Sequence, residues 1–112
     1  MCNIVWSKEA DDILSAGSAL WDADMHNWIL NRNEAKVAIL KLLEFGIPIL
    51  GGDVCRKIDN RFKYTYDSWH CDKNIIETDL EYLKRSINRS LEYINSYPLN
   101  CDTYFTLVPK RV

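Results

Sequence analysis

The chain of 112 residues, 47% of them hydrophobic, can bury one core of modest size, so we expect a single domain spanning residues 1–112. A formal net charge of −2 disfavours direct binding to nucleic acid, and no apolar run approaches the length of a membrane span. The start of the chain lacks the basic and apolar pattern of a secretion signal, which predicts a cytoplasmic protein with reduced thiols.

The first predicted element is a helix that begins after Ser7. This serine can cap the helix, and the acids of the first turn suit the positive end of the helix dipole. Residues at helical spacing continue the pattern as far as Trp21, with Gly17 as its weak point. They are Ile13, Leu14, Gly17, Leu20 and Trp21. Residues 22–31 are expected to form a loop that leads into a short extended or helical segment.

The next predicted helix covers residues 34–45. Asn33 is placed to cap its start, and Gly46 stands where a left-handed residue commonly ends a helix. Apolar residues occur around most of its circumference, which predicts a largely buried helix. Because Pro48 cannot continue the helix, a strand is expected to follow it.

The stretch "IPILGGD", residues 47–53, is either a functional loop or a corner. A phosphate-binding loop needs a longer glycine pattern at the start of a helix, whereas a strand-like segment follows here. We therefore predict a structural turn at Gly51, Gly52 and Asp53 that joins the helix to the sheet. The glycines would supply positive φ angles or close packing, and Asp53 would bind nearby backbone N–H groups.

A β-hairpin is predicted to turn at residues 59–61. A three-residue loop there gathers the even-numbered apolar residues on one face, with Arg56 among them as a cost. These apolar residues are Val54, Ile58, Phe62, Tyr64 and Tyr66. A two-residue turn at Asp59 and Asn60 would split them between two faces, so we expect the longer loop.

The last predicted helix begins after Thr78, which forms a capping-box pattern with Glu81. Apolar residues then recur at steps of three and four, Pro98 ends the helix, and residues 103–108 are expected to form a terminal strand. The apolar positions are Leu80, Leu83, Ile87, Leu91 and Ile94. The elements together predict an α+β fold in which a small antiparallel sheet, from residues around 49–70 and 103–109, packs against two to three helices.

Residues with chemically active side chains gather in "DSWHCD", residues 67–72. A metal site or a small cysteine hydrolase would use Cys71, His70 and Asp72. However, neighbouring residues on a strand point to opposite faces, and zinc needs three or four converging ligands. Neither Cys55 nor Cys71 is flanked by the pattern of a known cysteine enzyme. We therefore expect no catalysis, no metal and no other cofactor.

Several segments, in order along almost the whole chain, resemble one family. They are "NIVWS", "NWIL", "PILGGDV", "YDSWHCD", "YINSY" and "YFTLVPK". This set is similar to immunity family forty of bacterial polymorphic-toxin systems, which include contact-dependent growth inhibition. Two positions depart from the expected pattern, since Cys55 and His70 stand where aromatic residues are expected.

The resemblance implies a non-catalytic monomer that binds the C-terminal catalytic domain of a cognate toxin one to one and blocks it. That domain is often a nuclease, whose basic cleft would attract acids, and residues 1–24 carry a formal charge of −4. We predict toxin contacts by Asp22, Asp24 and Trp28, with Asp67 and Asp72 as the alternative surface. A regulatory adaptor domain with another protein partner is a further alternative.

Overall fold

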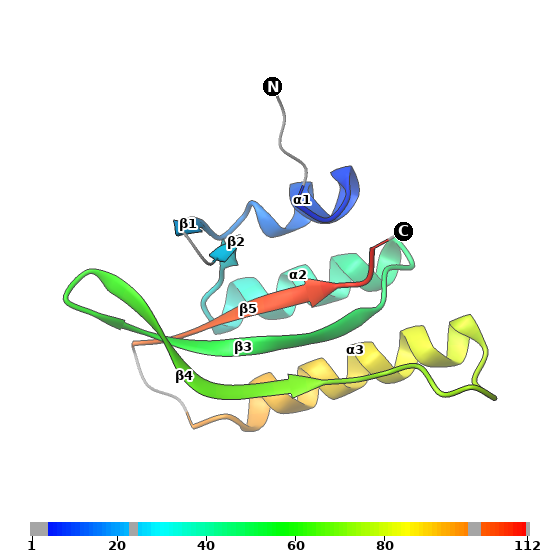
Figure 1. The fold of residues 1–112 in the computed structure, drawn as a ribbon. Helices are drawn as coiled ribbons and strands as arrows, with labels where there is room; N and C mark the ends of the chain where they lie inside the picture. The colour runs from blue at the N-terminus through cyan, green and yellow to red at the C-terminus, as the bar shows by residue number, and fades with distance from the viewer. Residues whose placement is uncertain (1–4, 23–24, 99–101, 112) are drawn as a thin grey trace.

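Three helices and two antiparallel sheets make up the computed structural model, which describes residues 5–22, 25–98 and 102–111 (Figure 1). The larger sheet has the strand order β4-β3-β5, and the smaller one pairs β1 with β2. The elements are α1 (Lys8–Leu14), β1 (Ser18–Asp22), β2 (Met25–Ile29), α2 (Arg32–Glu44), β3 (Ile49–Ile58), β4 (Arg61–His70), α3 (Asp79–Ser96) and β5 (Thr103–Pro109). The α+β class predicted from the sequence is confirmed.

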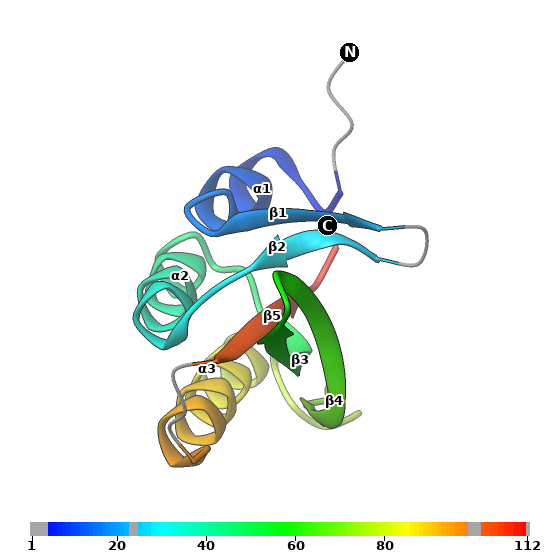
Figure 2. The same cartoon turned by 90° about the vertical axis from the view of Figure 1, so that its left-hand side faces the viewer.

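Helices α2 and α3 lie on one side of the larger sheet, and α1 lies with the small hairpin above α2 (Figures 1 and 2). The hairpin reaches the larger sheet through Leu30, which forms an isolated bridge to Phe105 of β5. Their two backbone hydrogen bonds measure 2.8 and 2.7 Å. The two sheets are therefore joined along the β5 edge.

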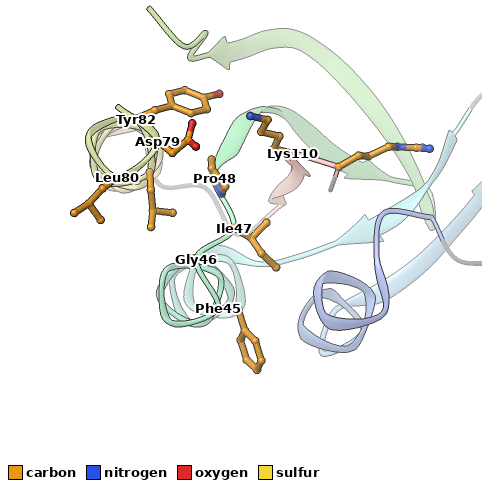
Figure 3. Close-up of a pocket in the computed structure, with 10 residues that line it drawn as sticks. Phe45, Gly46, Ile47, Pro48, Asp79, Leu80, Tyr82 and Lys110 are labelled. Atoms are coloured by element: carbon orange, nitrogen blue, oxygen red, sulfur yellow. The ribbon is translucent and has the colours of Figure 1, made fainter. Parts of the chain in front are cut away.

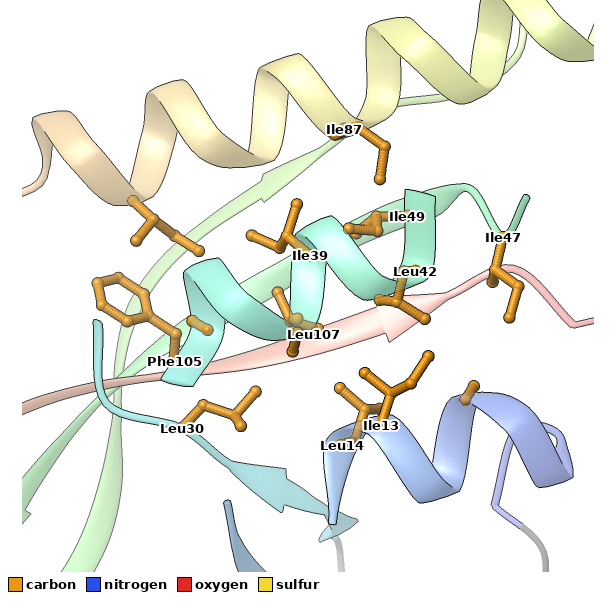
Figure 4. Packing of buried hydrophobic residues seen from close by; sticks show 14 of the residues in the cluster. Ile13, Leu14, Leu30, Ile39, Leu42, Ile47, Ile49, Ile87, Phe105 and Leu107 are labelled. Atoms are coloured by element: carbon orange, nitrogen blue, oxygen red, sulfur yellow. The ribbon is translucent and has the colours of Figure 1, made fainter. Parts of the chain in front are cut away.

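The core fills the space between the helices and the larger sheet (Figure 4). Leu14 of α1, Ile39 of α2 and Ile94 of α3 are fully buried, as are Val54 and Leu107 from the sheet. Because each element contributes side chains from one face, burial of apolar area holds helices and sheet together.

The first helix is shorter than predicted. It begins after the predicted cap Ser7 but ends at Leu14, and the residues expected to extend it form β1. At Gly17 a Cβ atom would lie 2.4 Å from the carbonyl oxygen of Ile29, so glycine allows the chain to pass close to β2. Spacing over so few residues cannot separate a helix from a strand, and pairing with β2 decides the outcome.

Helix α2 is capped by Asn31 instead of the predicted Asn33. The Asn31 side chain accepts a hydrogen bond from the Glu34 N–H at 2.8 Å, and the Glu34 carboxylate accepts one from the Asn31 N–H at 2.9 Å. This reciprocal pair is a capping box, which satisfies two backbone donors at once. Gly46 has a φ of +70°, which confirms the predicted left-handed residue at the helix end.

Helix α2 is buried along one face only, which corrects the prediction of a largely buried helix. Its inward residues, Ala35, Ala38, Ile39 and Leu42, belong to the core. About half of the surface of Val37 and of Leu40 stays exposed. Contacts with α1, α3 and β5 therefore cover only part of the circumference.

The double glycine lies inside the central strand and not in a corner. Gly51, Gly52 and Asp53 belong to β3, and the chain changes direction earlier, between Gly46 and Pro48. At Gly52 a Cβ atom would lie 2.2 Å from the carbonyl oxygen of Thr106 and 2.3 Å from the indole ring of Trp69. The turn prediction is wrong, and the prediction of close packing is confirmed.

The hairpin between β3 and β4 has a two-residue turn, which corrects the predicted three-residue loop. Ile58 pairs with Arg61, and the φ angles of Asp59 and Asn60 are +52° and +63°. Figure 1 shows this end of the hairpin extending beyond the helices. Residues 56–61 are exposed, so no buried face forces their apolar side chains together.

Helix α3 begins after Thr78 with the predicted capping box, and β5 forms at the predicted place. The first apolar position of the stripe departs from prediction, because Leu80 is 58% exposed. Tyr82 is buried instead, and its hydroxyl donates a hydrogen bond of 2.6 Å to the carbonyl oxygen of Cys71. The loop after β4 thus takes the space next to the first turn of α3.

Candidate partner-binding surface

Two members of the first predicted contact group, Asp22 and Trp28, belong to the small hairpin. Asp22 ends β1 opposite Met25, and Asp24 lies outside the described residues. Trp28 is half-buried and packs against the core cluster. A side chain already packed in this way has less surface left for a partner than a freely exposed anchor.

The alternative acids, Asp67 and Asp72, lie at separate positions along β4 and the loop after it. Asp67 is exposed, and its carboxylate accepts a hydrogen bond of 2.6 Å from the Tyr97 hydroxyl. This bond raises the pKa of Tyr97. Asp72 is exposed, and its backbone carbonyl accepts a hydrogen bond from Arg85 at 2.5 Å.

An unusual backbone conformation precedes Asp67. Tyr66 has a φ of +71°, which a non-glycine residue rarely adopts, and its side chain is 94% exposed. It lies where the pairing of β3 with β4 shifts its register, and the Thr65 hydroxyl there donates a 3.0 Å hydrogen bond to the Val54 carbonyl. Bulges of this kind re-aim side chains at sheet edges.

The residues that the alternative of a cysteine hydrolase would use lie in different surroundings. Cys71 is buried, whereas His70 at the end of β4 is exposed. The Cys71 sulfur accepts a hydrogen bond of 2.9 Å from Arg85. Within the described part of the chain, no group of three or more His, Cys, Asp or Glu side chains is placed to hold a metal ion.

Cys55, the thiol in the central strand, is also buried. Burial, and after it the charge of Asp53, raises the pKa of its thiol to about 12. The thiol therefore stays protonated near neutral pH, and a protonated thiol is a poor nucleophile. The Asp53 carboxylate accepts a hydrogen bond of 3.4 Å from the Thr106 hydroxyl on the neighbouring strand, which is a structural role.

A clamp centred on Arg85 orders the loop of residues 71–78. Its guanidinium donates hydrogen bonds of 2.6 and 2.8 Å to the two carboxylate oxygens of Glu77. The same carboxylate accepts a 3.1 Å bond from the Asn74 N–H. This bidentate geometry, together with the bonds to Cys71 and Asp72, fixes both ends of the loop to α3.

The ordered loop presents two apolar side chains to solvent that were not among the predicted contact residues. Ile75 is 101% exposed and Ile76 is 94% exposed. Their signal in the sequence was a pair of isoleucines that precedes the Thr78 cap and belongs to no strand or helical stripe. Burial by other elements was the default expectation for such residues, and only the folded arrangement shows them uncovered.

A pocket of about 710 Å³ opens between the end of α2 and the start of α3. Its apolar wall includes Phe45, Ile47 and Leu80, and Lys110 reaches it from the segment after β5 (Figure 3). The Lys110 ammonium lies 5.8 Å from the centre of the Tyr82 ring. The pocket is thus an apolar recess with a basic group held near it by a cation–π contact.

None of the described helices combines the length and the apolar character needed to cross a membrane.

A family model described as Immunity protein 40 matches residues 19–109 of the chain. The match begins within β1 and ends with β5, so it includes α2, α3 and the larger sheet. No curated protein and no solved structure matches the chain.

Proposed function

The chain belongs to the immunity protein 40 family, whose members are non-catalytic toxin inhibitors, and on this premise we propose which kind of toxin it neutralises. The proposed partner is the C-terminal catalytic domain of a toxin used in contact-dependent growth inhibition, with nuclease activity. In this proposal the protein is a cytoplasmic monomer that binds the toxin domain one to one and blocks it.

The family match over residues 19–109 carries the proposal. Membership makes the chain an inhibitor that binds a cognate toxin, and it overturns the alternatives of a hydrolase and of an adaptor with another partner. Inhibition of this kind requires an ordered surface and no reacting groups. The buried thiols of Cys55 and Cys71 agree with such a role.

The distribution of charge supports a nuclease as the target. A nuclease presents a basic cleft to the phosphate backbone, and acids on an inhibitor speed its encounter with such a cleft. Residues 1–24 carry a formal charge of −4, from Glu9, Asp11, Asp12, Asp22 and Asp24 against Lys8. Asp11 already has a structural partner, since its carboxylate accepts hydrogen bonds of 2.8 and 3.0 Å from the Val5 and Trp6 N–H groups.

The test uses the toxin domain encoded next to this chain. Expression of the toxin domain alone should stop growth and degrade cellular DNA or RNA. Co-expression of this chain should restore growth and leave the nucleic acid intact. With purified proteins, nuclease activity should fall to zero at one equivalent of this chain. Protection without any nucleic-acid cleavage by the toxin would contradict the nuclease part, and failure to protect or to form a complex would contradict the pairing itself.

Charge reversals compare the two predicted acidic surfaces. If the small hairpin meets the toxin, Asp22→Lys with Asp24→Lys should slow association, and most strongly at low ionic strength, because screening is weakest there. Asp67→Lys with Asp72→Lys is the matched pair on the other surface. A pair that leaves the association rate at low salt unchanged takes no part in toxin binding.

A further inference from the structure

Ile75 and Ile76 are almost completely exposed apolar residues that the fold does not use. Single exposed apolar residues are ordinary in folded proteins. Here two neighbours are 101% and 94% exposed, and Leu80 on the adjoining first turn of α3 is 58% exposed. Apolar side chains presented side by side in this way mark sites of contact with other proteins.

The backbone that carries these isoleucines is held before any partner binds. Arg85 fixes Glu77 through two hydrogen bonds, and it also binds Cys71 and Asp72 at the start of the loop. Within the loop, the Glu77 N–H donates a 3.1 Å hydrogen bond to the Asn74 carbonyl. A pre-ordered loop loses little conformational entropy on binding, which favours affinity.

The charges around the isoleucines are mostly negative. Asp79 lies 3.4 Å from the Lys73 ammonium, the Glu77 charge is paired with Arg85, and the Glu81 carboxylate accepts a 2.8 Å hydrogen bond from the Thr78 N–H. The formal charges of Asp72, Lys73, Asp79 and Glu81 nevertheless sum to −2. A partner that fits this surface therefore has an apolar recess with a basic rim.

We propose that residues 71–81 form the toxin-binding surface, with Ile75 and Ile76 inserted into an apolar recess of the toxin domain. The exposed Asp72, together with the net negative charge that Asp79 and Glu81 give this surface, faces basic groups at the rim of that recess. The proposal rests on the proposed function and deepens it, because a nuclease domain supplies the basic surface that these acids require. Apolar anchors surrounded by a charged rim are the usual anatomy of a protein interface.

The experiment measures binding of the toxin domain to the full chain by calorimetry or interferometry. Ile75→Ser with Ile76→Ser removes the proposed anchors, and both side chains are so exposed that thermal unfolding should be unchanged. Each buried isoleucine contributes enough that the double variant should bind on the order of 100-fold more weakly. The matched control is Val37→Ser with Leu40→Ser on the exposed face of α2, which should bind like the parent.

Each outcome decides the proposal. A large loss of affinity in the Ile75/Ile76 variant alone, with an unchanged unfolding temperature, supports it. Binding within threefold of the parent overturns it, and loss of self-association without loss of toxin binding assigns the isoleucines to contacts between copies of this chain instead. If the parent itself fails to bind the toxin domain, both the proposed function and the proposed binding surface are refuted.

Discussion

Replacing Gly52 by alanine tests whether the double glycine exists for close packing. The added methyl group would lie 2.2 Å from the Thr106 carbonyl oxygen and 2.3 and 2.7 Å from two ring atoms of Trp69. The Thr106 carbonyl belongs to β5, which pairs with β3 at this point, so it cannot move without disturbing the sheet. The Trp69 ring stacks on Tyr93 at 4.7 Å, which limits its own movement.

The expected loss of stability follows from these contacts. Overpacking of a core costs about 1–3 kcal/mol. Displacing the Trp69 ring also breaks its 3.1 Å hydrogen bond to the Ser90 hydroxyl, which contributes about 1 kcal/mol. We therefore expect Gly52→Ala to lower the free energy of unfolding by about 2–4 kcal/mol.

The assay is urea unfolding followed by circular dichroism, with two comparison variants. Gly46→Ala changes a residue at φ +70° with no atom within 4 Å of the added Cβ, so it should cost only about 1 kcal/mol of backbone strain. In the double variant Gly52→Ala with Trp69→Phe, the smaller ring leaves room for the added methyl group. The double variant should therefore lose less stability than the two single variants lose together. A change below about 0.5 kcal/mol for Gly52→Ala would refute the reasoning.

Three further predictions concern ionisation and backbone strain. The Arg85 hydrogen bond lowers the pKa of Glu77 to about 2, so the ion pair stabilises the fold above the ordinary glutamate pKa and this contribution disappears as the pH falls toward 2. Acid titration of stability should therefore show a gap between the parent and Glu77→Gln that is constant above about pH 5 and closes below it. Cys55, with its pKa near 12, should resist alkylation at pH 8 in the native protein and react rapidly in urea, as followed by site-resolved mass spectrometry. Labelling of native Cys55 at the rate of an exposed thiol would contradict its burial. Tyr66→Gly should leave stability unchanged or raise it by up to about 1 kcal/mol, because glycine adopts the observed φ of +71° freely, and a clear destabilisation would show that the tyrosine ring contributes to the fold.

Local signals in the sequence located the helix ends well. The Thr78 capping box and the left-handed Gly46 depend on residues within a few positions of each other, so they can be predicted without the tertiary structure. The cap at Asn31 was misplaced by two residues, although it uses the same chemistry. Asparagine occurs at both 31 and 33, and only the observed bonds with Glu34 select the first.

The candidate surface was far less predictable. Acids and tryptophans were the predicted contacts, yet Trp28 packs against the core and the Asp67 carboxylate accepts a hydrogen bond from Tyr97. Ile75 and Ile76 look like core residues by composition alone. Their loop is bonded at both ends to Arg85, which lies ten and nine positions further along the chain.

The sequence by itself determined the order of most elements, the three helix starts to within two residues and the α+β class, because capping and apolar periodicity act over a single helical turn. Only the tertiary structure decided that residues 18–22 form a strand, that Gly52 meets Trp69 and Thr106, and that Ile75 and Ile76 stay uncovered. Each of these outcomes is set by segments far apart in the chain. Strand pairing and side-chain burial are properties of the partner segments as much as of the residues themselves, so no local pattern contains them.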